Sequence, residues 1–281
     1  MTTPHTRVGT VPTVLGSLRV YDAGPVDGAA ALLWPSLFSD GQTSWGAQLA
    51  GLHALGWRTL LVDPPGTGGS EPASRLFTME ECADAAIQIL DAASVERAAM
   101  LGLSWGGFVG LRVALAAPQR VIALVLSNTT ARRPAFVGRQ RSRLNAALVR
   151  IGIPGGRGRL VAGAMLSKHS RLVDPAFAKQ FIAGANALDK AEASRAMRSV
   201  DVNRTSVVDG LDRITAPTLV IAGGEDKVFP HAHSDQLASR IRGAQLEVVP
   251  NVGHLSPGEA AMTVSALLER FLGAAALRTT P

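Results

Sequence analysis

Short, continuous apolar runs recur along this chain, and they constrain its fold more than any other feature. They end at Gly- or Pro-rich turns and alternate with stretches of helical spacing; they include residues 29–34, 58–63, 98–103, 121–127 and 217–223. Strands with one face in water alternate apolar and polar residues, whereas continuous runs are typical of a parallel sheet covered on both faces. The sequence therefore predicts an α/β fold, with a mostly parallel central sheet flanked by helices.

The alternation stops in the middle of the chain. Between about residues 131 and 210 strand-like runs disappear, and apolar residues recur at helical spacing: Leu144, Leu148 and Ile151, then Leu160, Ala164 and Met165. We expect residues 131–210 to form an inserted helical cap, with residues 1–130 and 211–281 as the two parts of the core. The apolar side chains of the cap are expected to pack inside it, with some of them lining a pocket.

Local signals place several other elements. Residues 13–21 partly alternate, which predicts an edge strand. Thr78 and Glu81 form a capping box that predicts a helix start, and Ser256 and Glu259 form a second one, with Pro257 at the first helical position.

Composition limits the classes of function. The chain has 281 residues, of which 47% are hydrophobic and 18% charged, as in globular proteins. One cysteine, Cys82, excludes an internal disulfide. The first residues lack the apolar core of a signal peptide, and no run is long enough to span a bilayer. We expect a soluble, cytoplasmic protein that takes a small-molecule substrate and has no membrane partner.

The net charge of +6 comes from one segment. Residues 131–173 contain no Asp or Glu but many Arg residues. Since no zinc-finger, RNP-type or basic-zipper motif accompanies them, we expect no nucleic-acid partner. The segment is either a solvated helical face or a positively charged surface whose electrostatic field attracts an anionic substrate.

The motif G-x-S-x-G stands at the end of the run 98–103, as Gly102-Leu103-Ser104-Trp105-Gly106. In a nucleophile elbow, small flanking residues let a strand turn sharply into a helix and hold the serine hydroxyl out of the backbone. The five-residue pattern alone also fits an ordinary strand-to-helix turn. The sequence predicts Ser104 as a nucleophile only if a base and an acid lie near it.

Two later strand ends supply a base and an acid. Asp226 follows the strand ending at Gly223, and His254 follows the run 245–249. Nucleophile, acid and then histidine is the chain order of hydrolases with an elbow. Asp226 is preferred to Glu225, and the alternative acid position, near Asn128, has no carboxylate.

The tetrahedral oxyanion needs two backbone donors. We expect the N–H of Trp105, the residue after the nucleophile, and the N–H of Leu37, with Ser36 as the alternate, from the loop after residues 29–34. His231 and His233 are closely spaced, but without further ligands at suitable spacing we expect no metal site.

Together, these motifs resemble the α/β-hydrolase superfamily across nearly the whole chain. They are the elbow 102–107, the Gly/Pro-rich loop 63–70, residues 224–226 and residues 253–254. The resemblance implies Ser104 as nucleophile, His254 as base, Asp226 as the orienting acid, and no cofactor. The loop Trp34-Pro35-Ser36-Leu37 departs from the usual His-Gly and is similar to that of 3-oxoadipate enol-lactonases.

The leading hypothesis is a serine hydrolase that cleaves a carboxylic ester or lactone through an acyl-enzyme on Ser104. A carbon–carbon bond hydrolase of a ring-cleavage product is the first alternative, and a slow-turnover ligand sensor on the same fold is the second. Haloalkane dehalogenases and epoxide hydrolases are disfavoured because both need a carboxylate where this chain has Ser104. The sequence leaves the acyl preference and the oligomeric state open.

Overall fold

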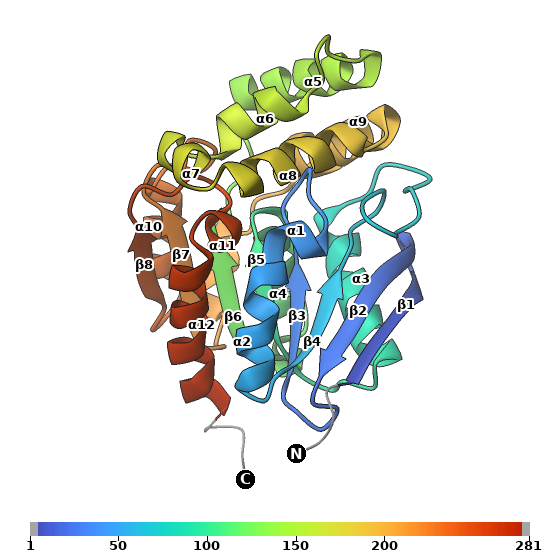
Figure 1. The fold of residues 1–281 in the computed structure, drawn as a ribbon. Helices are drawn as coiled ribbons and strands as arrows, with labels where there is room; N and C mark the ends of the chain where they lie inside the picture. The colour runs from blue at the N-terminus through green and yellow to red at the C-terminus, as the bar shows by residue number, and fades with distance from the viewer. Residues whose placement is uncertain (1–4, 277–281) are drawn as a thin grey trace.

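The computed structural model describes residues 5–276 and contains one eight-stranded sheet with helices on both faces (Figure 1). The strands are β1 His5–Thr13, β2 Gly16–Gly24, β3 Ala30–Trp34, β4 Arg58–Val62, β5 Ala98–Leu103, β6 Val121–Ser127, β7 Thr218–Gly223 and β8 Gln245–Val249. Their order in the sheet is β1-β2-β4-β3-β5-β6-β7-β8. Pairing is parallel from β4 to β8, and β2 pairs antiparallel with both β1 and β4. The predicted fold class is confirmed.

Helices cover both faces of this sheet. Those of the core are α1 Gly41–Trp45, α2 Leu49–Ala54, α3 Met79–Ala92, α4 Trp105–Ala116, α10 Ala232–Arg240, α11 Ser256–Glu259 and α12 Ala261–Ala276. In Figure 1, α2 and α12 lie in front of the sheet, and α3 and α4 lie behind it. Every residue of β3, β5 and β7 is buried, as the continuous apolar runs require.

The segment between β6 and β7 is helical. It contains α5 Phe136–Ile151, α6 Gly158–Met165, α7 Lys168–Val173, α8 Pro175–Ala187 and α9 Lys190–Met197, and then a π-helical turn, Arg198–Val202. Figure 1 shows these helices together at the top, above the end of the sheet towards which β3 and β4 point. We call α5 to α9 with the π-helical turn the cap.

The prediction of one edge strand over residues 13–21 is wrong. The chain reverses after Thr13, because Gly16 adopts a φ of +103°, a conformation that side-chain-bearing residues rarely take. The Thr13 hydroxyl closes the turn by donating to the carbonyl of Gly16 at 2.7 Å. The result is a hairpin in which β1 is the edge strand and β2 joins it to β4.

The first capping box is present as predicted. Thr78 accepts from the N–H of Glu81 at 3.1 Å, and the Glu81 carboxylate accepts from the N–H of Thr78 at 2.8 Å, where α3 begins. Between residues 5 and 276, no helix combines the length and the apolar character needed to cross a membrane.

Candidate active site

Ser104 occupies a sharp turn between β5 and α4. Its φ is +53° and its ψ −103°, which is a strained conformation for a residue with a Cβ. The turn is held by two hydrogen bonds: the N–H of Ser104 donates to the carbonyl of Ser127 at 2.9 Å, and the hydroxyl of Thr129 donates to the carbonyl of Ser104 at 2.8 Å. The strain is thus maintained by the neighbouring β6 strand.

Glycine is required on both sides of this turn. A Cβ on Gly102 would collide with the backbone of Gly106, and a Cβ on Gly106 would collide with the backbone of Trp34. The close approach of α4 to β3 and β5 therefore depends on the two flanking glycines of the motif.

Three side chains far apart in the sequence form one hydrogen-bonded row. The Ser104 hydroxyl lies 2.8 Å from Nε2 of His254, and Nδ1 of His254 lies 2.8 Å from Oδ2 of Asp226. All three are buried. Because a carboxylate can only accept, Nδ1 of the neutral imidazole carries the proton, and Nε2 is left to accept from the serine hydroxyl.

The environment of Asp226 keeps this carboxyl ionised. Burial raises its pKa, but the charge and hydrogen bond of His254, the N–H of Phe229 and the amide of Asn128 outweigh burial, so the pKa is lower than usual. Oδ1 accepts from the N–H groups of Val228 at 2.8 Å and Phe229 at 3.0 Å. Every partner of this carboxylate is a donor.

Asn128 is a site residue that the sequence did not reveal. It lies just after β6, where the sequence offered no carboxylate, and its Nδ2 donates to Oδ2 of Asp226 at 3.1 Å and to the carbonyl of Gly253 at 3.0 Å. The position near the end of β6 that could have carried the acid therefore holds the amide of Asn128, which positions the carboxylate of Asp226. A polar residue at a strand end was the only available signal.

The second predicted capping box is wrong, and its glutamate has another role. The residue before α11 is Leu255, with no side-chain cap, and the Ser256 hydroxyl has no hydrogen-bond partner. The Glu259 carboxylate instead accepts from the N–H groups of Gly253 at 3.0 Å and Leu255 at 2.9 Å, and from that of Ser167 in the cap at 2.9 Å. Glu259 thus fixes both neighbours of His254 and ties their loop to the cap.

The predicted oxyanion donors differ in their availability. The N–H of Ser36 donates to the hydroxyl of Ser44 at 3.3 Å, so it is already engaged. Within residues 5–276, the N–H groups of Leu37 and Trp105 donate no hydrogen bond. The carbonyl of Pro35 accepts from the N–H of Gly106 at 3.2 Å, which ties the Leu37 loop to the start of α4. This geometry favours Leu37 over Ser36 as the second donor.

The indole of Trp105 packs in the core. Its ring stacks on Phe77 with centroids 5.6 Å apart and lies edge-on to Trp34 at 5.9 Å, and the side chain is 1% exposed. Its backbone N–H therefore remains the part of Trp105 that could contact a substrate.

Aromatic and charged side chains lie near His254 and the cap. The Phe229 ring lies 5.3 Å from the imidazole, and the buried guanidinium of Arg204 lies 3.9 Å above the ring of Phe108. Asp201, in the π-helical turn of the cap, is partly exposed; its pKa is raised, because burial outweighs the opposing effect of Arg204 and His254. These contacts could not be predicted from the sequence, because π-helical turns have no simple spacing.

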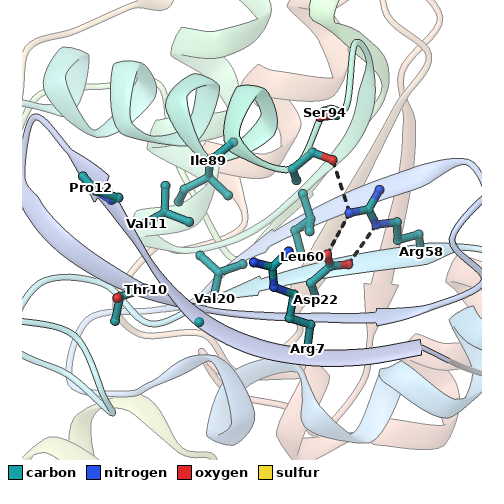
Figure 2. Close-up of a pocket in the computed structure, with 13 residues that line it drawn as sticks. Arg7, Thr10, Val11, Pro12, Val20, Asp22, Arg58, Leu60, Ile89 and Ser94 are labelled. Carbon is teal, nitrogen blue, oxygen red and sulfur yellow. Dashed lines mark hydrogen bonds and ion pairs between the residues drawn. The ribbon is translucent and has the colours of Figure 1, made fainter.

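A separate pocket lies away from this row. Figure 2 shows it between the β1–β2 hairpin and α3, where Arg58 and Asp22 make a two-pronged ion pair at 2.7 and 2.8 Å. These two charges form an ion pair with one another, and none of the residues that line the pocket belongs to the row of Ser104, His254 and Asp226. No cluster of metal-ligating side chains occurs in the part of the chain that the structure describes.

If the N–H of Leu37 is an oxyanion donor, as the sequence predicts, its removal in Leu37→Pro is expected to lower kcat about 10²- to 10³-fold. Leu37→Ala retains the N–H and is the matched control, with kcat expected within tenfold of wild type. Steady-state hydrolysis of p-nitrophenyl acetate measures both, and circular dichroism checks the fold. Equal losses in the two variants would mean that the side chain, and not the N–H, is what matters.

Comparisons with known proteins show what this chain is similar to. The model of the alpha/beta hydrolase family matches residues 31–266. The chain is 34% identical over 256 residues to a Variovorax paradoxus protein named as a carbamate hydrolase, RutD (88% of this chain and 92% of that one). It is 30% identical over 248 residues to a 2-hydroxy-6-oxononadienedioate/2-hydroxy-6-oxononatrienedioate hydrolase of Cupriavidus pinatubonensis (83% of each).

The resemblance to enol-lactonases is also confirmed. The chain is 27% identical over 250 residues to 3-oxoadipate enol-lactonase 1 of Acinetobacter baylyi (85% of this chain and 87% of that one). Among solved structures, a hydrolase from Pseudomonas aeruginosa superposes with a TM-score of 0.85 at 30% identity (95% of this chain and 98% of that one). Since the family model spans both parts of the core as well as the cap between them, this chain belongs to the alpha/beta hydrolase family.

Proposed function

We propose that this protein is a cofactor-independent serine hydrolase that cleaves a carboxylic ester or lactone through an acyl-enzyme on Ser104. The observation that carries the proposal is the hydrogen-bonded row from Ser104 through His254 to Asp226. A serine hydroxyl needs a base to become a nucleophile, and the base needs an acid to fix its tautomer.

The geometry supports the following steps. Oγ of Ser104 attacks the carbonyl carbon, and Nε2 of His254 takes the hydroxyl proton. The N–H groups of Trp105 and Leu37 stabilise the oxyanion. As the tetrahedral intermediate collapses, His254 gives its proton to the leaving alkoxide, and the acyl group stays on Ser104. Water then attacks the acyl-enzyme with His254 again as base, which releases the acid and restores Ser104.

The choice of an ester or lactone rests on the Ser36-Leu37 loop and on the enol-lactonase relative. The carbamate hydrolase named above supports the same carbonyl chemistry with a different leaving group. A purified-enzyme screen of p-nitrophenyl esters, lactones, thioesters and carbamates tests the choice. We expect kcat/KM to be at least about tenfold higher for an ester or lactone than for the other classes; a carbamate or thioester preference would contradict the proposal.

One alternative has its own support. The relative from Cupriavidus pinatubonensis is named as a hydrolase of 2-hydroxy-6-oxononadienedioate, and this similarity supports carbon–carbon bond cleavage as the second candidate. A coloured dienone substrate would lose its absorbance if this activity were present. Saturable ligand binding without a burst of product in single-turnover experiments would instead favour a sensor.

A further inference from the structure

The outer helix of the cap carries an unusual surface. α5 packs on α9 and the π-helical turn through a face that includes the buried residues Ala146 and Val149. With 3.6 residues per turn, Val137, Leu144, Leu148 and Ile151 share the opposite face. Their side chains are between 47% and 79% exposed. We call these four residues the α5 stripe.

The α5 stripe overturns an expectation from the sequence. The helical spacing of Leu144, Leu148 and Ile151 predicted packing inside the cap, yet all three lie in water, as does Leu160 of α6. The helix periodicity was right, but the face that packs is the less apolar one. Single exposed apolar residues are normal, whereas exposed apolar residues that gather on one face can mark a protein or membrane interaction site.

The charges around the stripe have one sign. Arg141 lies beside Leu148 at one edge of the stripe, and Arg143 and Arg150 lie about a quarter-turn beyond Ile151 at the other edge; all three are exposed. Residues 131–173 contain no acidic side chain that could neutralise them. In Figure 1, α5 forms the upper boundary of the molecule, away from the sheet. The stripe and its arginines therefore face solvent without a partner among the described residues.

We propose that the α5 face of the cap docks on a lipid surface that carries anionic headgroups. A helix with an apolar stripe and exposed arginines lies in the plane of a membrane interface, with the apolar side chains below the headgroups and the guanidinium groups among them. The proposal replaces the expectation that the protein has no membrane partner, and it does not depend on the proposed reaction.

Charge complementarity decides between this occupant and two others. A second copy of the chain, docked through the same face, would bring together two surfaces on which Arg141, Arg143 and Arg150 all carry positive charge, which is unfavourable. Nucleic acid would satisfy the arginines but would leave the α5 stripe without an apolar partner. An anionic lipid surface satisfies both the charge and the apolar side chains.

Co-sedimentation with vesicles tests the proposal. The full chain is mixed with phosphatidylcholine vesicles, and with vesicles in which a quarter of the lipid is phosphatidylglycerol, at about 0.1 M salt. We expect partitioning onto the anionic vesicles to be on the order of a hundredfold stronger, because each basic side chain near such a surface contributes about fivefold. At about 1 M salt most of this difference should disappear.

Two triple variants separate the contributions of charge and apolar area. The first variant removes charge and combines Arg141→Gln, Arg143→Gln and Arg150→Gln. The second removes apolar area and combines Leu144→Gln, Leu148→Gln and Ile151→Gln. Each variant is expected to bind anionic vesicles at least about tenfold more weakly than the wild type. Matched controls alter exposed residues elsewhere: Arg97, Arg240 and Arg242 to Gln for charge, and Val26, Leu55 and Met262 to Gln for apolar area. The controls should bind as wild type.

The remaining outcomes would overturn the proposal. Absence of binding to anionic vesicles, or equal losses in the variants and their controls, would show that the α5 face is not a lipid-binding surface. Analytical ultracentrifugation tests for a second copy of the chain. A dimer of the wild type that dissociates in the triple variant Leu144→Gln, Leu148→Gln, Ile151→Gln would identify the second copy as the occupant. If only the arginine variant lost vesicle binding, and the wild type bound duplex DNA as tightly as it binds vesicles, the occupant would be a polyanion and not a lipid surface.

Discussion

Ser104→Ala is expected to lower kcat for p-nitrophenyl acetate by about 10⁵- to 10⁶-fold, since removing the nucleophile of a comparable triad costs about this much. The hydroxyl is the only nucleophilic group hydrogen-bonded to Nε2 of His254, at 2.8 Å, among the described residues. Stopped-flow and steady-state absorbance measurements would show both the missing burst of p-nitrophenol and the loss of turnover.

Ser256→Ala provides a matched control for this result. Ser256 is another buried serine close to His254 in the chain, and its hydroxyl has no hydrogen-bond partner. Its replacement should leave kcat within about tenfold of wild type, because no step uses that hydroxyl. If Ser104→Ala retained wild-type activity while its circular dichroism was unchanged, the proposed acyl-enzyme would be wrong.

Much of the fold was predictable because burial on both faces leaves a strong local pattern. The runs 98–103 and 121–127 match β5 and β6 residue for residue, because strands covered on both faces are nearly continuous apolar runs. The hairpin of β1 and β2 was missed because its reversal depends on the backbone conformation of one glycine, Gly16. In an edge hairpin, half the side chains face water and the apolar signal is weak.

The candidate site was predictable to the extent that it depends on strand ends. Ser104, Asp226 and His254 each follow a strand, and parallel strands bring their carboxyl ends to one edge of the sheet. Asn128 and Glu259 were missed because their roles are long-range hydrogen bonds. At position 259 the local pattern was misleading: a glutamate three residues after a serine indicated a cap, but the loop of His254 competed for its carboxylate.

Asp226→Asn is expected to lower kcat about 10⁴-fold with little change in fold. In the wild type, the Asp226 carboxylate faces donors on all sides: the N–H groups of Val228 and Phe229, Nδ2 of Asn128 and Nδ1 of His254. An asparagine has one oxygen for these donors and must turn its NH₂ group towards the others.

The two backbone N–H groups are the less adaptable partners, so the oxygen of the new asparagine should stay with Val228 and Phe229, and its NH₂ group should face His254. Nδ1 must then accept, the imidazole proton moves to Nε2, and His254 can no longer take the proton of Ser104. The exposed neighbour Glu225 gives the matched control, because Glu225→Gln removes a carboxylate and leaves the hydrogen bonds of Asp226 unchanged. The steady-state kcat for p-nitrophenyl acetate is measured for both variants. If Glu225→Gln lowered kcat strongly while Asp226→Asn stayed active, Glu225 and not Asp226 would be the acid.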